Sequence, residues 1–361
     1  VHEHATYYCA QLLRTACATS LDGGVTWLPF TQVLGGCGGL HGHIAVSPTG
    51  FAAVPHKGCG SGEGPVGGGE RVVGFAFTAD NGATWGSRIV PGSTQGPDGG
   101  FDPSIDFSRP SGWMWIAQAD ELGIHVGLSK DEGLTWETIG TSTDGVEPGA
   151  WLNLNAAFRD PRTGHPIRFA TFPDVMAGDD ERAAISFMAT TDPEGRSPFD
   201  DCSSASDANV WHYYLALTLD AGQTWTVQRL LEDPVQVGAI WDGGGGDPCR
   251  NLLDFNDADL DSQGRIHIAF ADGCTGRCAE KWDEHMRGRG GPPAGADSRD
   301  AHGTILRQAT GPGLFAAFDR PAPGPQPAPQ EDEGETQAQP APGLLVAALA
   351  LLGAALLLRR R

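Results

Sequence analysis

An eight-residue motif, Ser/Thr-x-Asp-x-Gly-x-Thr-Trp, occurs four times and constrains the fold more than any other feature of the chain. Its copies span residues 20–27, 78–85, 129–136 and 218–225. An aspartate two residues before a glycine predicts a tight turn, in which the carboxylate accepts backbone N–H groups and the glycine takes a positive φ. The Thr-Trp pair then predicts the start of a strand whose indole packs against a neighbouring sheet. Four copies in register predict an internal repeat.

The four copies resemble the Asp-box, or BNR, repeats of the sialidase-like β-propellers. The resemblance implies an all-β fold in which each box is the turn between the third and fourth strands of a blade, on the face away from the ligand site. It therefore implies a structural role, and no catalytic one, for the four box aspartates, which are Asp22, Asp80, Asp131 and Asp220.

Four segments have the pattern of an inner strand, a polar turn and a second strand: residues 40–54, 102–117, 172–187 and 255–270. Three of them are followed by a box, and the last is followed by a closing strand at 304–308. With a partial blade at the N-terminus, this predicts five visible blades, the first without its inner strand. Propellers of the family usually have six or more, so we expect the full-length protein to supply further strands upstream of Val1. The chain starts without an initiator Met or a signal peptide, which we interpret as processing or truncation.

The composition limits the classes of partner that the chain is expected to bind. The 361 residues carry a formal charge of −21, which argues against a nucleic-acid partner because phosphate binding requires clustered Lys and Arg. The 52 glycines and 26 prolines suit many short strands joined by turns. Long irregular segments between blades should gather on one rim of the propeller, which we call the upper face, and such loops commonly carry binding sites.

Eight cysteines without a convincing Cys/His zinc pattern predict disulfides and an oxidising compartment. Proximity within or between adjacent blades predicts four pairs: Cys9 with Cys17, Cys37 with Cys59, Cys202 with Cys249, and Cys274 with Cys278. The last pair has the spacing Cys-x-x-x-Cys, for which metal binding or redox chemistry is the alternative.

Three domains are expected. Residues 1–320 form the propeller, and residues 321–342 form a disordered Pro/Gln/Glu-rich linker. Residues 343–361 form a tail of sixteen apolar or small residues followed by three arginines. A tail helix of this kind predicts a membrane anchor with the arginines inside and the propeller outside, hence an extracellular, surface-anchored protein. A buried core helix and a prokaryotic C-terminal sorting tail, cleaved after export, are the alternatives.

The inner strands suggest an axial site. When they are aligned, His43, Ser104, Asp174 and Asp257 occupy one equivalent position, and His41 and Asp102 lie two residues earlier. These groups should converge near the upper end of the axis, where His43 and Asp257 could bind a divalent cation such as Ca²⁺, or Asp174 and Asp257 could perform acid–base catalysis. The alternative is a water-filled channel lined by polar side chains.

The resemblance implies sialidase activity only if the catalytic motifs of sialidases are also present. The family uses an arginine triad for the substrate carboxylate, an aspartate acid/base and a tyrosine nucleophile. Arg168 and Arg250 lie where clamp residues belong, but the third arginine cannot be located and the Phe/Tyr-Arg-Ile-Pro motif is missing. All four tyrosines fall in expected second or third strands.

Two functions from different classes follow. One is an exported, membrane-tethered propeller that binds a glycan or a protein through its upper-face loops. The other is a sialidase-like glycoside hydrolase, or a lyase, that uses the axial carboxylates. Binding without turnover would select the first.

Overall fold

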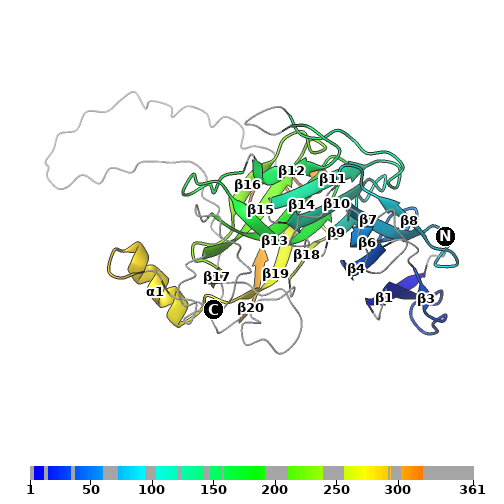
Figure 1. The fold of residues 1–361 in the computed structure, drawn as a ribbon, viewed down its shortest axis with the longest axis horizontal. Coiled ribbons are helices and arrows are strands. Elements are labelled where there is room, and N and C mark those ends of the chain that lie inside the picture. The colour runs from blue at the N-terminus through cyan, green and yellow to red at the C-terminus, as the bar shows by residue number, and fades with distance from the viewer. Residues whose placement is uncertain are drawn as a thin grey trace, which may run out of the picture.

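The computed structural model describes residues 4–11, 15–33, 37–59, 72–93, 103–120, 123–141, 147–156, 158–191, 210–238, 256–291, 293 and 302–319. They form five antiparallel sheets, which are the blades of an all-β, five-bladed propeller (Figure 1). The predicted fold class is therefore confirmed. A sixth blade remains a prediction about the full-length protein.

The blades follow the chain. Blade 1 contains β1 (Thr6–Gln11), β2 (Thr15–Ser20) and β3 (Thr31–Gln32). Blade 2 contains β4 (Cys37–His41), β5 (Ala45–Val46), β6 (Ala52–Cys59), β7 (Val72–Thr78) and β8 (Gly86–Ile89). Blade 3 contains β9 (Ser104–Phe107), β10 (Met114–Asp120), β11 (Gly123–Ser129) and β12 (Leu152–Asn153). Blade 4 contains β13 (Arg168–Ala177), β14 (Ala183–Thr190), β15 (Val210–Thr218), β16 (Thr226–Arg229) and β17 (Gln236–Val237). Blade 5 contains β18 (Asp257–Leu260), β19 (Ile266–Asp272) and β20 (His302–Arg307).

The main strands of each blade are arranged in chain order, while the short strands β5 and β17 pair beside this path, with β6 and β15 respectively. In blades 2 to 4 the inner strand leads to a second and a third strand, and the repeated motif then connects the third strand to a fourth. Within the described residues, blade 1 has no inner strand and blade 5 has no fourth strand. The absence in blade 1 agrees with the sequence-based prediction.

Blades pack face to face through their apolar residues. The largest cluster of buried side chains joins blades 3, 4 and 5, and includes Trp115, Tyr213 and Phe270. A second cluster joins blades 2 and 3 around Phe75 and Phe107. Middle strands such as β11 and β14 are buried along their whole length, because both of their faces are covered by neighbouring blades.

The four repeated turns share one hydrogen-bond pattern. One carboxylate oxygen of the aspartate accepts from the first Ser/Thr hydroxyl and from the N–H of the later threonine. The other oxygen accepts from that threonine hydroxyl at 2.6 Å in every copy. These bonds lower the carboxyl pKa in all four turns, and the Thr26 hydroxyl is the largest cause in bringing that of Asp22 to about 2. The acceptor role predicted from the sequence is thus observed at Asp22, Asp80, Asp131 and Asp220.

The backbone of these turns is left-handed at two successive residues. The motif glycine has a positive φ, as the sequence predicted, but so does the residue before it, which is Gly23, Asn81, Glu132 or Ala221. Two left-handed residues in succession match the twist of the antiparallel strands on either side. The φ of the preceding residue was not predicted, because its identity differs in every copy.

The motif tryptophans pack toward the preceding blade. Trp225 of blade 4 meets Trp115 of blade 3, and Trp85 of blade 2 meets Tyr7 of blade 1. Trp27 is different, since it is 46% exposed and contacts Tyr8 of its own blade. The expectation that every indole packs against a neighbouring sheet is therefore wrong for Trp27, because the described residues contain no blade before the first.

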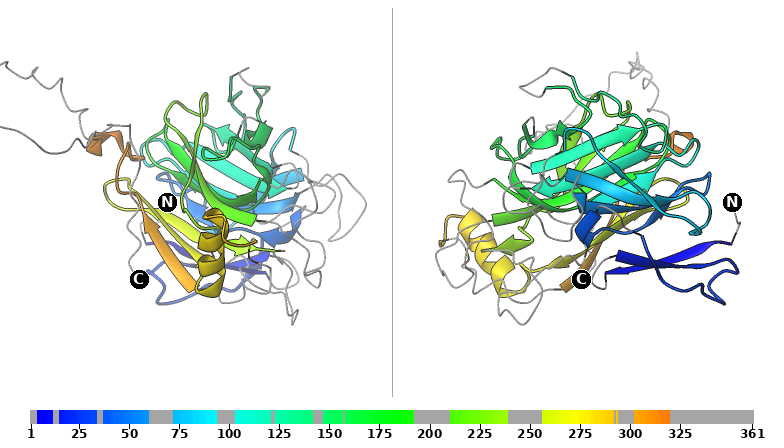
Figure 2. Two further views of the ribbon diagram at one scale, coloured as in Figure 1. Left: turned by 90° about the vertical axis from the view of Figure 1, so that its left-hand side faces the viewer. Right: turned by 45° about the vertical axis from the view of Figure 1, so that its right-hand side comes forward.

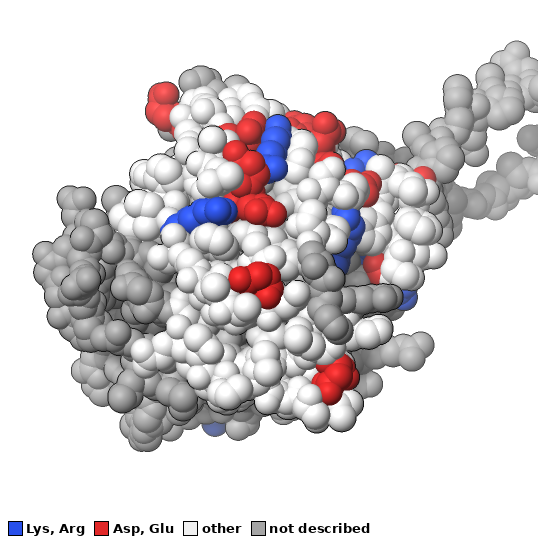
Figure 3. Space-filling model, turned by 90° about the vertical axis from the view of Figure 1, so that its right-hand side faces the viewer, with Lys and Arg blue, Asp and Glu red and all other residues white. Residues whose placement is uncertain are grey.

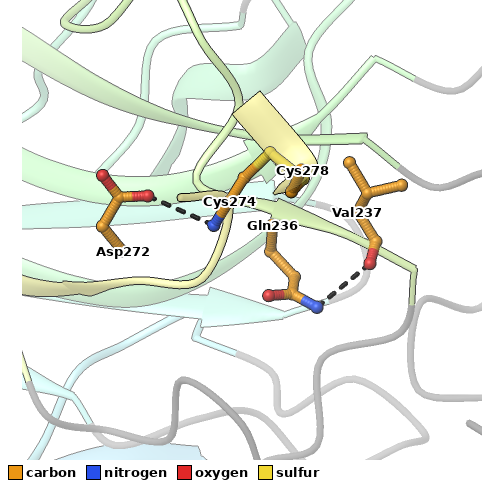
Figure 4. The surroundings of a disulfide bond; sticks show 5 residues. All are labelled: Gln236, Val237, Asp272, Cys274 and Cys278. Carbon is orange, nitrogen blue, oxygen red and sulfur yellow. Dashed lines mark hydrogen bonds between the residues drawn. A yellow bond between two sulfur atoms is a disulfide. The ribbon is translucent and has the colours of Figure 1, made fainter. Parts of the chain in front are cut away.

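The described residues contain one α-helix. It is α1 (Arg277–Met286), and it lies at one end of the molecule beside β17 (Figures 1 and 2). The sequence predicted only a long connection here. The disulfide between Cys274 and Cys278 ties the first turn of α1 to the end of β19, where Asp272 accepts the backbone N–H of Cys274 (Figure 4). The described residues also form short 3₁₀ helices at Leu154–Ala156 (η1) and Ala316–Phe318 (η3).

Two of the four predicted disulfides are confirmed, Cys9–Cys17 and Cys274–Cys278. The second result excludes the metal-binding alternative for that pair in the oxidised protein. Cys37 and Cys59 lie opposite one another in the register of β4 and β6, and their side chains are outside the described set. Cys202, Cys249, the linker at 321–342 and the tail at 343–361 also lie outside the described residues. Among the helices that the structure describes, none is long and apolar enough to cross a bilayer.

Candidate functional site

Three inner strands, and the segment between β4 and β5, bring polar side chains together at one end of the propeller axis. Ser104 donates its hydroxyl to one carboxylate oxygen of Asp174 at 2.9 Å. The carboxyl of Asp257 is close enough to Asp174 to raise its pKa. The Nδ1 atom of His43 lies 4.0 Å from an Asp257 oxygen. The four residues predicted to share one register therefore meet, and we call them the axial cluster.

The cluster lies at the upper end of the axis. Ser104 and Asp257 are the first residues of β9 and β18, and the hairpin turns that follow these strands lie at the opposite end. One repeated turn contacts such a hairpin turn directly, since the Ala221 N–H donates to the carbonyl of Glu181 at 2.9 Å. The repeated turns and the axial cluster thus occupy opposite ends of the molecule.

The outer members of the cluster are open to solvent and the inner members are covered. The side chains of His43 and Asp257 are 81% and 69% exposed, whereas Asp174 is partly covered by its neighbours. Burial is the main reason that the pKa of Asp174 rises to about 8, and the nearby Asp257 carboxylate raises it further. Asp174 is therefore largely protonated at neutral pH, and it offers an O–H donor beside the Asp257 carboxyl.

The inner-strand side chains also join the blades. Asp174 accepts the backbone N–H of Ala258 in blade 5 at 2.6 Å, and Ser104 accepts that of Val175 in blade 4 at 3.0 Å. One layer below, Asp106 accepts the N–H of Ala177 at 2.8 Å. Inner strands are edge strands, so their N–H groups need partners outside their own sheet. These three side chains supply them.

Asp106 is a residue of this region that the sequence analysis did not single out. It is two residues beyond Ser104 in β9 and therefore shares its face of the strand. Its pKa is raised to about 6, mainly by burial and to a small extent by Asp259, against the lowering effect of the N–H groups that it accepts. The period-two spacing of Ser104 and Asp106 could have signalled this role. The spacing can be interpreted only once the N–H groups on the edge of β13 are known to lack partners in their own sheet.

No metal site is found among the residues that the structure describes. They contain no group of three or more His, Cys, Asp or Glu side chains placed to hold an ion. His43 and Asp257 offer two donors 4.0 Å apart, fewer than the six to eight oxygens that Ca²⁺ takes. The described residues therefore do not fit the Ca²⁺ ion that was considered from the sequence.

The remaining predicted site residues are not part of the cluster's described contacts. Arg168 is the first residue of β13, and its side chain is exposed. His41 belongs to β4, opposite His56, and its side chain is outside the described set. Asp102 and Arg250 also lie outside the described residues. An arginine clamp is therefore not assembled within the part of the chain that the structure describes.

Replacing Asp174 by asparagine should make stability less dependent on pH. Because the folded pKa of Asp174 lies above that of the unfolded chain, its contribution is fully present below about pH 4 and is lost as the pH rises through about 8. Asparagine keeps an acceptor for Ala258 and has no charge to bury. We expect Asp174→Asn to unfold at a higher temperature than the unmodified chain at pH 8, with a smaller difference at pH 5.

Thermal unfolding followed by circular dichroism from pH 5 to pH 8 measures this effect. Asp283→Asn is a suitable control, since it replaces an exposed carboxylate on α1. If the unfolding temperatures of the unmodified chain and of Asp174→Asn changed in parallel across the whole pH range, Asp174 would not have a raised pKa, and the prediction would be wrong.

Comparisons with known proteins give similar shapes at low identity. No family model and no curated protein matches the chain. Among solved structures, an ulvan lyase of polysaccharide lyase family PL25, bound to -[GlcA(1-4)Rha3S]-, is 13% identical with a TM-score of 0.46, over 84% of this chain and 66% of that one. The intramolecular trans-sialidase of Ruminococcus gnavus is 16% identical with a TM-score of 0.36, over 72% of this chain and 46% of that one. The NanB sialidase of Streptococcus pneumoniae is 9% identical with a TM-score of 0.39, over 81% and 53%. The chain thus spans about two thirds or less of the length of each.

Proposed function

We propose that this chain is an exported, membrane-tethered Asp-box propeller that binds a glycan at the upper end of its axis. The observation that carries the proposal is the axial cluster, in which exposed His43 and Asp257 lie beside the partly buried Asp174 and Ser104. The Asp-box assignment of the four repeated turns is supported by their shared sequence and hydrogen bonds. Export is supported by two disulfides, and tethering by the tail sequence alone.

The chemistry of the cluster suits hydroxyl groups. A sugar hydroxyl both donates and accepts, so it can bridge the Asp257 carboxylate and the protonated carboxyl of Asp174. The imidazole of His43 supplies a further donor or acceptor at the rim. Binding hot spots of protein partners are usually aromatic side chains and arginine. The axial cluster contains neither, which favours a polyhydroxylated ligand over a protein.

The hydrogen bonds of Asp174 argue against the hydrolase. Most glycosidases need both of their carboxyls free to act on the glycosidic bond, one as general acid and the other as nucleophile or base. One oxygen of Asp174 accepts the Ser104 hydroxyl at 2.9 Å and the other accepts the Ala258 N–H at 2.6 Å, so both are held by contacts between blades. Binding without turnover is the expected result for this pair.

A glycan array combined with a panel of fluorogenic glycosides tests the proposal. We expect the full chain to bind at least one class of glycan and to release no fluorophore. Binding should fall at least tenfold in Asp257→Ala and stay unchanged in Glu137→Gln, which alters a surface carboxylate paired with Lys130. Hydrolysis that Asp174→Asn abolishes would support the enzyme instead. Binding that depends on the upper-face loops and ignores Asp257 would contradict the axial site.

A further inference from the structure

The inner strands of neighbouring blades are joined by one repeated kind of contact. The hydroxyl oxygen of Ser104 in β9 accepts the N–H of Val175 in β13 at 3.0 Å. Two residues further along both strands, the carboxylate of Asp106 accepts the N–H of Ala177 at 2.8 Å. At the next interface, Asp174 of β13 accepts an N–H of β18 at 2.6 Å. Each inner strand thus offers side-chain acceptors to the extended backbone of the blade that follows it.

Strand β18 carries the same pair of acceptors. Asp257 and Asp259 are two residues apart, and Asp257 occupies the register position of Ser104. Asp259 is therefore the equivalent of Asp106. The two aspartates also have the same conformation, because the Oδ1 atom accepts the N–H of the following residue at 2.8 Å in Asp106 and at 2.7 Å in Asp259. In Asp106 this arrangement leaves Oδ2 to accept the N–H of the next blade.

The acceptors on β18 are open, whereas those on β9 are covered. The side chain of Asp257 is 69% exposed and Asp259 is also exposed, but Ser104 and Asp106 are partly covered. Blade 5 is followed around the axis by blade 1, whose described residues include no inner strand. No described residue donates a hydrogen bond to the Oδ2 atom of Asp259. The acceptors of β18 therefore lack the extended strand that their equivalents bind.

We propose that this side of β18 binds an extended peptide strand of a separate polypeptide, in which two N–H groups, two residues apart, donate to Asp257 and Asp259. The two interfaces already formed show the chemistry of the occupant, since an extended backbone supplies the donors in both. Peptide recognition by strand addition depends on main-chain hydrogen bonds in the same way, and bonds to a carboxylate are charge-assisted. The donor residues at the formed interfaces are all small and apolar: Val175, Ala177 and Ala258. We expect small apolar residues, and no proline, at both donor positions of the partner.

Charge favours a basic partner. Among the described residues, no Lys or Arg forms an ion pair with Asp257 or Asp259. The formal charge of −21 attracts cationic segments at long range. Strand binding is compatible with the glycan site and does not depend on it. Asp174 uses one oxygen for Ser104 and the other for Ala258, so Asp257 can likewise accept an N–H with one oxygen and a sugar hydroxyl with the other.

Fluorescence polarisation with a labelled peptide and the full chain tests the proposal. The probe is a Lys-flanked peptide with the sequence of residues 174–178, which contains the valine and alanine donors of β13, and with asparagine in the place of Asp174 so that no further carboxylate is brought to the axis. We expect saturable binding. It should weaken at least tenfold when the valine and alanine amides of the peptide are N-methylated, because methylation removes both donors.

Asp259→Ala should also weaken peptide binding at least tenfold, and Glu137→Gln should leave it unchanged. Asp259 has no part in the proposed glycan site, so failure of the peptide to bind would not bear on glycan binding by the same protein. Absence of saturable binding would overturn the proposal, and so would equal affinities for the methylated and unmethylated peptides. Peptide binding that Asp259→Ala leaves intact and that a bound glycan displaces would assign the peptide to the axial cluster instead.

Discussion

Gly133→Ala is expected to lower the free energy of unfolding by about 3 kcal/mol, through backbone strain and overpacking together. Gly133 lies in the third repeated turn with φ +83°, which an alanine adopts only with strain. A Cβ at this position would also overlap the ring of Phe75 and lie 3.1 Å from the Met114 methyl group. Both neighbours belong to the apolar packing of blades 2 and 3, so neither can move without opening that interface.

Gly24→Ala is the matched control, because Gly24 holds the same place in the first repeated turn. Its φ is +91°, but its Cβ would meet nothing closer than the Trp27 ring at 3.8 Å. Only the backbone strain remains, about 1 kcal/mol. Urea unfolding of both variants measures the difference. Equal losses would show that the third turn does not lock blades 2 and 3 together.

Asp160→Ala is expected to destabilise the protein by about 3–5 kcal/mol, because it leaves a buried guanidinium without its counter-charge. Asp160 is 1% exposed and lies 3.5 Å from Arg229, whose side chain is 6% exposed. It also accepts the hydroxyl of Tyr214 at 2.7 Å. Burial raises its pKa, but the Tyr214 hydroxyl, two backbone N–H groups and Arg229 outweigh that effect and bring it to about 2.

The pH dependence of this ion pair is opposite to that of Asp174. A depressed folded pKa means that Asp160 stabilises the protein above about pH 4 and loses this contribution as the pH falls through about 2. Glu232→Ala is the control, since Glu232 pairs with Arg162 but is 85% exposed, and exposed pairs contribute about 0–1 kcal/mol. The double variant Asp160→Ala, Arg229→Met should recover part of the loss. A loss below that of Glu232→Ala would contradict the buried-pair account.

The sequence predicted those features of the fold that repeat along the chain or depend only on neighbouring residues. Turn chemistry, strand order and the register of the inner strands follow from the spacing of Asp, Gly and Trp and from alternation. The meeting of His43, Ser104, Asp174 and Asp257 was predicted in this way, because equivalent positions on inner strands surround one axis. Their functional roles remain predictions.

What the sequence did not reveal depends on long-range contacts. The N–H of Ala177 lacks a partner within its own sheet, so Asp106 is needed beside it, and no local pattern shows this. Trp27 differs from the other motif tryptophans only because of which blade precedes it. Helix α1 has only a short apolar stripe, with Cys278, Trp282 and Met286 spaced by four residues, and Cys278 is its one buried residue, so the sequence predicted a connection for this segment.

Surface charge is consistent with a ligand that is not a polyanion. On the face drawn in Figure 3, acidic and basic side chains lie interspersed, and no basic patch is visible among the residues coloured. The formal charge of −21 for the whole chain repels anionic ligands at long range, whereas neutral ligands are not repelled. We therefore expect neutral glycans to bind more tightly than sulfated or sialylated ones.

Calorimetric titration of the best-binding glycan tests the axial site most directly. The account predicts that Asp257→Asn and His43→Ala each weaken binding at least tenfold at pH 7. Asp174→Asn imitates the protonated carboxyl, so it should bind within threefold of the unmodified chain at pH 7. At pH 9 the unmodified chain should bind more weakly, whereas Asp174→Asn should still bind. Glu137→Gln should leave the affinity unchanged at both values. Equal affinities for all of these proteins would contradict the account.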